Sequence, residues 1–341
     1  MTSIKRGVSL YSLQDAYGRG GLGLEGTIAA VEKMGTQGIE FLSDQMLTGA
    51  QKASENTLRE WDAIIERHPL DLVSNDIFVN STLYRNRTLT LEEQAELLSS
   101  DLRLANRLGF RLVRVVSRTD PRLIKMTVDL AEKLDVTMAV EIHAGMSFDH
   151  PLTAGWINEM KRIGSDHLGI VVDFGIFCQR HPRVSANYFR GLGVNEDVIA
   201  YIDDIFASGT DPKHAFKATS TEEKDSYEFP DELTRLFHNP LDQFYAMMSS
   251  GYENTCLDVL DEYKPYIKSF HAKFWEMTDD GEEYSIDYHR IFDRLHTIGW
   301  SGYVCSEYEG QRFVSPGEPI HDIAQVSAHQ RFLSELIGEG K

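Results

Sequence analysis

Short runs of β-branched and other apolar residues alternate with amphipathic segments along most of the chain. Helical periodicity, with apolar residues recurring every three or four positions, is clear at 26–33, 90–108, 121–134 and 320–336. Strands that alternate with helices predict a parallel sheet buried on both faces. The apolar runs span residues 6–12, 38–44, 70–79, 110–117, 136–143, 168–175, 267–274 and 302–309.

These eight strand and helix units predict an α/β protein of the (β/α)8 type, a TIM barrel that occupies residues 1–341 as a single domain. A doubly wound open sheet is the alternative. Several of the predicted strands carry polar residues at their C-terminal ends. This favours the barrel, because barrel enzymes carry their chemistry at that face.

One connection is much longer than the others. About ninety residues separate the sixth predicted strand from the seventh, whereas a loop, helix and loop need only a few tens. We assign residues 178–264 to a long helical insertion. It either packs as extra helices on the barrel, or covers the active-site mouth or docks another subunit. Because it follows the C-terminal end of a strand, it should rise over or beside the barrel mouth.

Charge and composition exclude several classes of protein. The chain carries 53 acidic and 34 basic residues, a formal net charge of −19. Nucleic acid and anionic membranes are therefore not expected partners, since binding them requires clustered Lys and Arg. No apolar run approaches the roughly 18 residues of a membrane span. With no signal-peptide pattern at the N-terminus, we expect a cytoplasmic protein.

A glycine-rich motif follows the first predicted strand. Gly18, Gly20 and Gly23 match G-x-G-x-x-G, and Glu40 lies at about the distance of a ribose-binding acid. In a dinucleotide site the first glycine turns the chain directly off the strand, whereas residues 13–17 intervene here. We interpret the motif as a flexible loop at the barrel mouth.

Residues suited to bind a divalent cation lie at the ends of four successive predicted strands. Taken singly, each has an ordinary explanation as a solvated or hydrogen-bonded group. Together they would crowd three carboxylates and an imidazole at one barrel mouth, where unpaired buried carboxylates are costly. This oxygen-rich set predicts a site for Mn²⁺, with Mg²⁺ or Co²⁺ as alternatives. The four residues are Glu141, Asp173, His271 and Glu307.

Each of the four has a neighbour two residues further on, and the two-residue period of a strand directs such pairs to the same side. Three of these neighbours are candidates for chemistry: His143, Lys273 and Glu309. Lys273 either binds substrate oxygens or neutralises the carboxylates. Glu309 either positions a ligand-bound water or faces solvent. We take Lys273 and Glu309 as the candidate substrate-binding residues.

Short motifs surround these residues: E-I-H at 141–143, V-V-D-F-G at 171–175, H-A-K-F at 271–274 and S-E-Y-E at 306–309. With them the chain resembles the xylose-isomerase-like family of sugar isomerases and epimerases. That resemblance implies that Glu141, Asp173, His271 and Glu307 are the metal ligands. More narrowly, K-R-G-V-S-L-Y-S at 5–12, the E-I-H motif and the long insertion are similar to the α subunit of bacterial C-glycoside deglycosidases.

The narrower resemblance implies a carbon–carbon lyase that acts on 3-keto C-glycosides of flavonoid-like aglycones, in a hetero-oligomer with a small β subunit. A metal ion would assist removal of a proton next to the sugar carbonyl by stabilising the enolate. His143 would be the general base or acid, because an imidazole titrates near neutral pH and this one neighbours Glu141. Alternatively, His143 only orients Glu141.

Two positions depart from the pattern of the isomerases and epimerases. Many of those enzymes have a His three residues after the strand-six Asp, where this chain has Ile176. Many also follow the strand-seven lysine with Asp, where this chain has Phe274. These departures argue against classical isomerisation of a free or phosphorylated sugar. A metal-dependent keto-sugar isomerase, epimerase or dehydratase remains the alternative to the lyase.

Overall fold

The computed structural model describes residues 4–220 and 225–339. Its parallel strands close into a barrel in the order β1-β10-β9-β6-β5-β4-β3-β2. The predicted TIM barrel is therefore confirmed, and the open doubly wound sheet is excluded. The barrel strands are β1 (Ile4–Ser9), β2 (Gly38–Phe41), β3 (Asp71–Ile77), β4 (Leu112–Val115), β5 (Thr137–Ile142), β6 (Leu168–Asp173), β9 (Ile267–Phe274) and β10 (Gly302–Tyr308).

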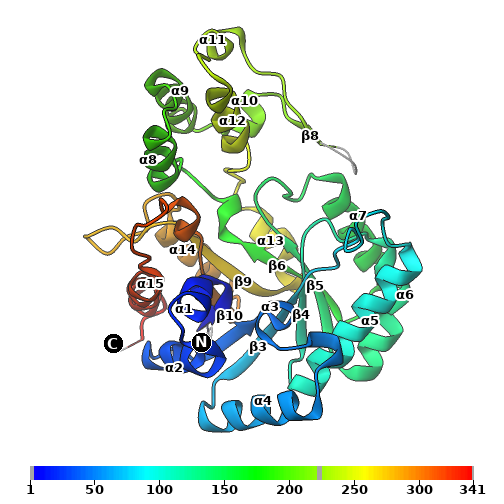
Figure 1. The fold of residues 1–341 in the computed structure, drawn as a ribbon. Helices are drawn as coiled ribbons and strands as arrows, with labels where there is room; N and C mark the ends of the chain where they lie inside the picture. Colours follow the sequence, from blue (N-terminus) through cyan, green and yellow to red (C-terminus); the bar gives the residue numbers. More distant parts are fainter. Residues whose placement is uncertain (1–3, 221–224, 340–341) are drawn as a thin grey trace.

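Helices surround the barrel on its outer side (Figure 1). Within the described residues, no helix is both long and apolar enough to cross a membrane. The predicted helices at 26–33, 90–108, 121–134 and 320–336 all exist, with ends that differ by at most a few residues. The outer helices are α2 (Gly23–Lys33), α4 (Glu55–Arg67), α5 (Leu91–Leu108), α6 (Arg122–Leu134), α7 (Pro151–Ile163), α14 (Tyr288–Ile298) and α15 (Asp322–Ile337).

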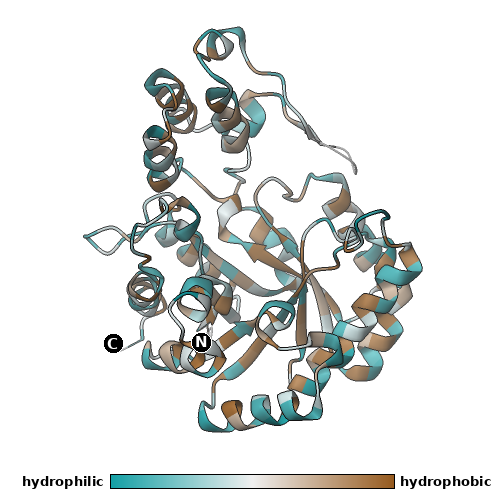
Figure 2. Ribbon diagram, in the orientation of Figure 1, coloured by the Kyte–Doolittle hydropathy of each residue, from teal (hydrophilic) through white to brown (hydrophobic). Residues whose placement is uncertain are grey.

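The core fills the space between the barrel and these helices. Every residue of β2, β4 and β6 is buried, as expected for strands that are covered on both faces. Figure 2 shows apolar residues along the strands and polar residues on the outer faces of the helices. The apolar strand runs that were visible in the sequence therefore face a continuous core.

Several strands end earlier than the apolar runs predict. A 3-10 helix at Leu10–Leu13 follows β1, the short helix α3 (Ser43–Met46) follows β2, and another 3-10 helix at Phe174–Ile176 follows β6. Apolar residues continue beyond the strands because these turns pack against the barrel rim. β5 and β10 also end one residue before the predicted runs do, so His143 and Glu309 lie just after these strands rather than within them.

The chain between β6 and β9 forms a separate group of helices. Because β6 and β9 are hydrogen-bonded neighbours, this group leaves the barrel intact. In Figure 1 the helices α8 to α12 stand at the top of the view, away from α4. Residues 221–224 of the predicted insertion lie outside the described residues. The elements are α8 (Arg183–Gly191), α9 (Glu196–Ala207), α10 (Pro212–Ala215), β7 (Thr219–Ser220), β8 (Asp225–Ser226), α11 (Asp231–Thr234), α12 (Pro240–Ser249) and α13 (Val259–Tyr263).

The glycine-rich motif does not follow a strand directly. The 3-10 helix and the short helix α1 (Gln14–Gly18) separate β1 from it, and Gly23 is the first residue of α2. Glu40, the candidate ribose-binding acid, is fully buried within β2. This arrangement agrees with the interpretation of the motif as a connecting loop.

Gly38 begins β2 at a point where three strands approach closely. A Cβ atom at this position would lie 2.7 Å from Val73 Cγ2 and 2.9 Å from both the Asp71 carbonyl oxygen and Tyr303 Cε1. Real Cβ atoms do not approach other atoms this closely, and one of the obstacles is backbone. The barrel therefore requires glycine here.

We expect Gly38→Ala to destabilise the protein by about 1–3 kcal/mol, because the added methyl group overpacks the barrel. Gly18→Ala is the matched control, since no heavy atom lies within 4 Å of its Cβ position. Thermal unfolding of both variants tests this. Equal midpoints for the two variants would contradict the explanation.

Candidate functional site

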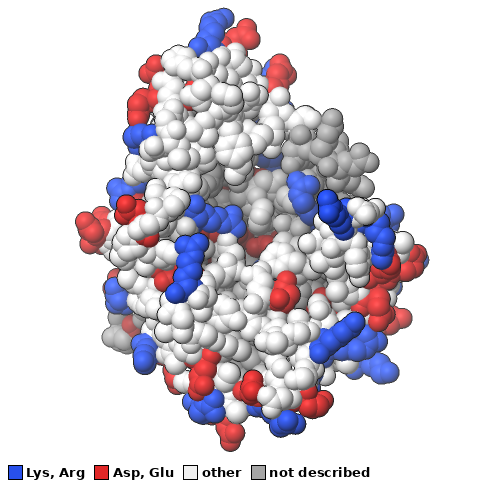
Figure 3. All heavy atoms as spheres, viewed as in Figure 1, with Lys and Arg blue, Asp and Glu red and all other residues white. Residues whose placement is uncertain are grey.

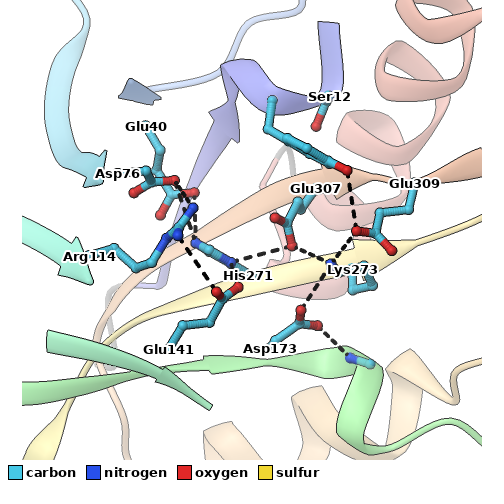
Figure 4. A network of polar contacts seen from close by, with 12 residues as sticks. Ser12, Glu40, Asp76, Arg114, Glu141, Asp173, His271, Lys273, Glu307 and Glu309 are labelled. Carbon is cyan, nitrogen blue, oxygen red and sulfur yellow. Dashed lines mark hydrogen bonds and ion pairs between the residues drawn. The ribbon is translucent and has the colours of Figure 1, made fainter. Parts of the chain in front are cut away.

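Four ligand-type side chains converge inside the C-terminal mouth of the barrel. Each offers one atom, a carboxylate oxygen or an imidazole nitrogen, and these atoms all lie within 4.8 Å of one another. They come from β5, β6, β9 and β10, and all four are buried. The structure thus brings together Glu141, Asp173, His271 and Glu307, as drawn in Figure 4. We call these four residues the ligand cluster.

Strand register explains this convergence. Asp173 pairs with His271 across β6 and β9, and Glu307 pairs with Lys273 across β10 and β9. His271 Nδ1 lies 2.9 Å from Glu141 Oε1 and 3.3 Å from Glu307 Oε2. Because parallel strands present register partners at the same height, residues from distant parts of the chain meet in one layer.

Lys273 lies among the carboxylates rather than facing solvent. Its Nζ is 3.0 Å from Asp173 Oδ2, 2.9 Å from Glu307 Oε2 and 3.1 Å from Glu309 Oε1. The Glu309 carboxylate also accepts a hydrogen bond from the Tyr11 hydroxyl. Lys273 therefore links the inner carboxylates to Glu309 at the mouth.

Burial and the neighbouring charges shift the pKa values of Glu141, Asp173 and Lys273. Burial would raise the pKa of Glu141, but the positive charges of Arg114 and His271 bring it below its usual value. Burial raises the pKa of Asp173 to about 6, against the opposing charge of Lys273. Burial would lower the pKa of Lys273, but the surrounding carboxylates raise it well above its usual value. The site is thus a buried concentration of negative charge that attracts cations.

A second layer of charged side chains lies on the other side of His271 and consists of Glu40, Asp76 and Arg114. The sequence pattern did not predict these residues as part of the site. His271 Nε2 is 3.4 Å from Glu40 Oε2 and 3.9 Å from Asp76 Oδ2. Arg114 Nη2 is 3.1 Å from Asp76, and its Nη1 is 3.6 Å from Glu141. Figure 4 shows Arg114 lying between the two layers.

One signal in the sequence could have revealed this layer. Glu40, Asp76 and Arg114 are charged residues within the apolar runs of β2, β3 and β4. A charge in a strand that is buried on both faces must find a partner of opposite sign. Their shared location on adjacent strands predicts that they meet inside the barrel.

A cavity of about 210 Å³ opens above the ligand cluster. Asp173 and Lys273 form part of its floor, and His143, Glu309 and Arg312 line its polar side. Figure 3 shows a hollow on this face, with acidic side chains inside it and basic side chains around its edge. The less polar lining comes from Ala144, Gly175, Met248, Gly251, Tyr252 and Trp275.

The residues of the cluster fit a divalent cation by their chemistry. Three carboxylates and one imidazole are the donors that Mn²⁺, Mg²⁺ and Co²⁺ accept, and no thiolate takes part among the described residues. His271 faces Glu40 and Asp76 with Nε2, so its Nδ1 is directed toward Glu141 and Glu307. A carboxylate behind the distal nitrogen is a common way to orient a metal-binding histidine.

Comparison with known families adds a separate observation. The model of the family described as "Xylose isomerase-like TIM barrel" matches residues 28–336. The chain belongs to this family. The match spans the strands that carry the ligand cluster and the helices that surround them.

Two curated relatives are similar over nearly the whole chain. A C-glycoside deglycosidase alpha subunit from Arthrobacter globiformis is 28% identical over 345 residues, which cover 98% of this chain and 94% of the relative. A 3'-dehydrocarminate deglycosidase alpha subunit from a Microbacterium species is 25% identical over 346 residues, which cover 98% and 95%. The insertion between β6 and β9 is thus included in these matches.

Among solved structures, D-psicose 3-epimerase in the presence of D-fructose has a similar fold. Its TM-score is 0.58 at 13% sequence identity, with 98% of this chain and 100% of that chain covered. At this level of identity the likeness concerns the fold alone. It agrees with the barrel found here.

Removal of Arg114 provides a test of the charged layers. We expect Arg114→Met to lower the free energy of unfolding by about 3–5 kcal/mol, because buried Asp76 and Glu141 would lose the guanidinium that they share and be left with His271 as their cationic neighbour. The control is Arg107→Met, whose partner Asp62 is half exposed; its loss should be at most about 1 kcal/mol. Urea unfolding of the metal-free proteins measures both. Similar losses in the two variants would refute this account of the buried charges.

Proposed function

We propose that the chain is the metal-dependent subunit of a carbon–carbon lyase that cleaves the C-glycosidic bond of 3-keto C-glycosides. The observation that carries this proposal is the buried cluster of three carboxylates and His271 beneath a cavity that His143 lines. The names of the two relatives, both deglycosidase alpha subunits, support the same reaction. Those names also support a partner, which we propose is a small β subunit.

The divalent ion would be held by Glu141, Asp173, His271 and Glu307. The proposed ion is Mn²⁺, with Mg²⁺ or Co²⁺ as alternatives. When bound, such an ion supplies Lewis-acid stabilisation of the negative charge that develops on the sugar's carbonyl oxygen. Lys273 already neutralises part of the cluster through Asp173 and Glu307. The protein thereby keeps several carboxylates close together before the substrate arrives.

His143 is the candidate general base. A 3-keto group acidifies the hydrogen on the adjacent C2, and transfer of this proton to the imidazole leaves an enolate over C2 and C3. When the carbonyl re-forms, a double bond forms between C1 and C2, and the bond from C1 to the aryl carbon breaks. The electron pair leaves with the aryl carbon, which takes up a proton derived from the solvent. The products are the free aglycone and an unsaturated keto-sugar.

Lys273 and Glu309 are the candidate substrate-binding residues. Both line the cavity and are ion-paired with each other at 3.1 Å. The ammonium can donate hydrogen bonds to sugar oxygens, and the carboxylate can accept them from hydroxyl groups. Arg312 Nη2 is 3.0 Å from Glu309 Oε1, and the Arg312 Nε and Nη2 groups both donate hydrogen bonds to the Tyr11 hydroxyl. These contacts hold the polar side of the cavity in place.

The aglycone would lie against the less polar wall. Tyr252 and Trp275 meet edge to face with ring centroids 5.3 Å apart, and Met248 is 48% exposed beside them. Flat apolar ligands favour such surfaces. A cavity of about 210 Å³ is smaller than most small-molecule sites, which begin near 300 Å³. We therefore infer that it takes the sugar and that a flavonoid-like aglycone extends outward.

The first experiment removes the candidate base. We expect His143→Gln to slow aglycone release from a 3-keto C-glucosyl flavone by about 10²–10⁴-fold, while the metal content stays unchanged. His289→Gln is the control, because this exposed His pairs with Glu282 elsewhere. Chromatography follows release and elemental analysis follows metal. A His143→Gln variant within about tenfold of the wild type would reject the base assignment.

The second experiment addresses the ion. Chelation should abolish aglycone release, and added Mn²⁺ should restore it in the wild type but not in Glu307→Gln. Mn²⁺ should also raise the thermal midpoint of the wild type, because a ligand that binds only the folded state stabilises it. Titrations with Mg²⁺ and Co²⁺ then rank the metals. An unchanged midpoint with every ion would argue against a metal site.

A further inference from the structure

The loop that follows β5 is attached to the insertion at three points. The Gly145 N–H donates to Glu253 Oε1 at 2.8 Å, and Ser147 Oγ lies 3.3 Å from Thr255 Oγ1. Lys213 Nζ lies 2.9 Å from Asp149 Oδ1 and 3.2 Å from Glu253 Oε1. The loop thus contacts two separate segments of the insertion, and His143 is its first residue.

The segment that carries Glu253 is itself fixed to the barrel. The Cys178 N–H donates to the Glu253 carbonyl at 2.7 Å, and the Thr255 N–H donates to the Ile176 carbonyl at 2.7 Å. The Asn254 N–H donates to Asp211 at 3.1 Å. The first two bonds tie the segment to the residues just after β6, and the third ties it to the rest of the insertion, so the Glu253 side chain extends from a backbone that is fixed on both sides.

Glu253 and Lys213 form a shielded pair. Glu253 is 2% exposed, and the Lys213 side chain is 12% exposed. Burial raises the pKa of the Glu253 carboxyl, and the Lys213 ammonium opposes this effect. A hydrogen bond from an amide to a charged carboxylate is stronger than one to a neutral acceptor. The pair therefore gives the Gly145 amide a strong acceptor.

His143 depends on its backbone for its position. Among the described residues, its Nδ1 is buried and has no hydrogen-bond partner. Its carbonyl oxygen accepts the Met146 N–H at 2.9 Å, which closes a turn over 143–146. Within this turn Gly145 has a φ of +84°, a conformation that favours glycine. The placement of the imidazole over the cavity follows from how this turn is held.

We propose that Glu253, supported by Lys213, is a positioning residue that fixes the 143–150 loop and thereby the imidazole of His143. The insertion between β6 and β9 then takes part in the reaction by holding the general base in place. This inference rests on the proposed role of His143.

Paired variants test the proposal in the full chain. Glu253→Ala removes the acceptor of the Gly145 amide, whereas Glu253→Gln keeps a side-chain oxygen there. We expect faster hydrogen exchange of a peptide covering 143–150 in the alanine variant and near-normal exchange in the glutamine variant. We expect kcat for aglycone release to fall about 10- to 100-fold in the alanine variant, since small misplacements of a catalytic group have such effects. KM and metal content should not change.

The matched control is Asp242→Ala. Asp242 is another buried carboxylate of the insertion, and it accepts N–H bonds from Asn195, His238 and Asn239, away from the loop. An equal loss of kcat in this control would mean that general loosening of the insertion is responsible, and would overturn the proposal. Unchanged exchange or unchanged kcat in Glu253→Ala would also overturn it.

Two further outcomes can be distinguished: a Glu253→Ala variant that does not fold, and a wild type that releases no aglycone. If Glu253→Ala does not fold, Asp149→Ala removes the attachment to Lys213 at an exposed residue and should shift exchange and kcat in the same direction; no shift in either would refute the proposal. If the wild type releases no aglycone, the proposed function fails. Exchange in Glu253→Ala still decides whether Glu253 fixes the loop.

Discussion

The need to balance buried charge governs this structure. Carboxylates from five barrel strands lie within the interior, where an unpaired charge is strongly unfavourable. Arg114, His271 and Lys273 compensate them, each in contact with at least two carboxylates. Arg114 and His271 each contact carboxylates of both charged layers. Each ion pair therefore depends on the register of the neighbouring strands. The same concentration of negative charge is what makes the barrel mouth suitable for a divalent cation.

Much of the fold and part of the site can be read from the sequence, because both follow from local pattern. Apolar runs gave the barrel, and the ligand-type residues stand where those runs end, as with Asp173 and Glu307. The pattern did not place Glu40 and Arg114 in the site, and Glu40 was considered only as a ribose-binding acid, because both lie within the apolar runs, where the role of a charge depends on a partner on another strand. The Gly145–Glu253 bond joins positions 108 residues apart. No periodicity signals such a contact.

The barrel and the insertion have different physical tasks. The barrel fixes charged side chains through strand register, which leaves little freedom in their positions. The insertion contributes Met248 and Tyr252 to the cavity and holds the loop that carries His143. A common fold with a rigid charged centre can acquire a particular substrate preference in this way, through an inserted segment whose side chains line the cavity.

The central claim is that the site forms an enolate from a 3-keto sugar and then breaks the bond to the aglycone. Proton NMR in D₂O tests it most directly, with the Mn²⁺-loaded protein, co-expressed with the proposed small β subunit, acting on a 3-keto C-glucosyl flavone. The account predicts that released aglycone carries deuterium at the carbon that was bonded to the sugar, and that the C2 proton of the sugar is lost. Exchange at C2 without release would contradict the lyase and indicate an isomerase or epimerase. Absence of both signals would contradict the substrate class itself.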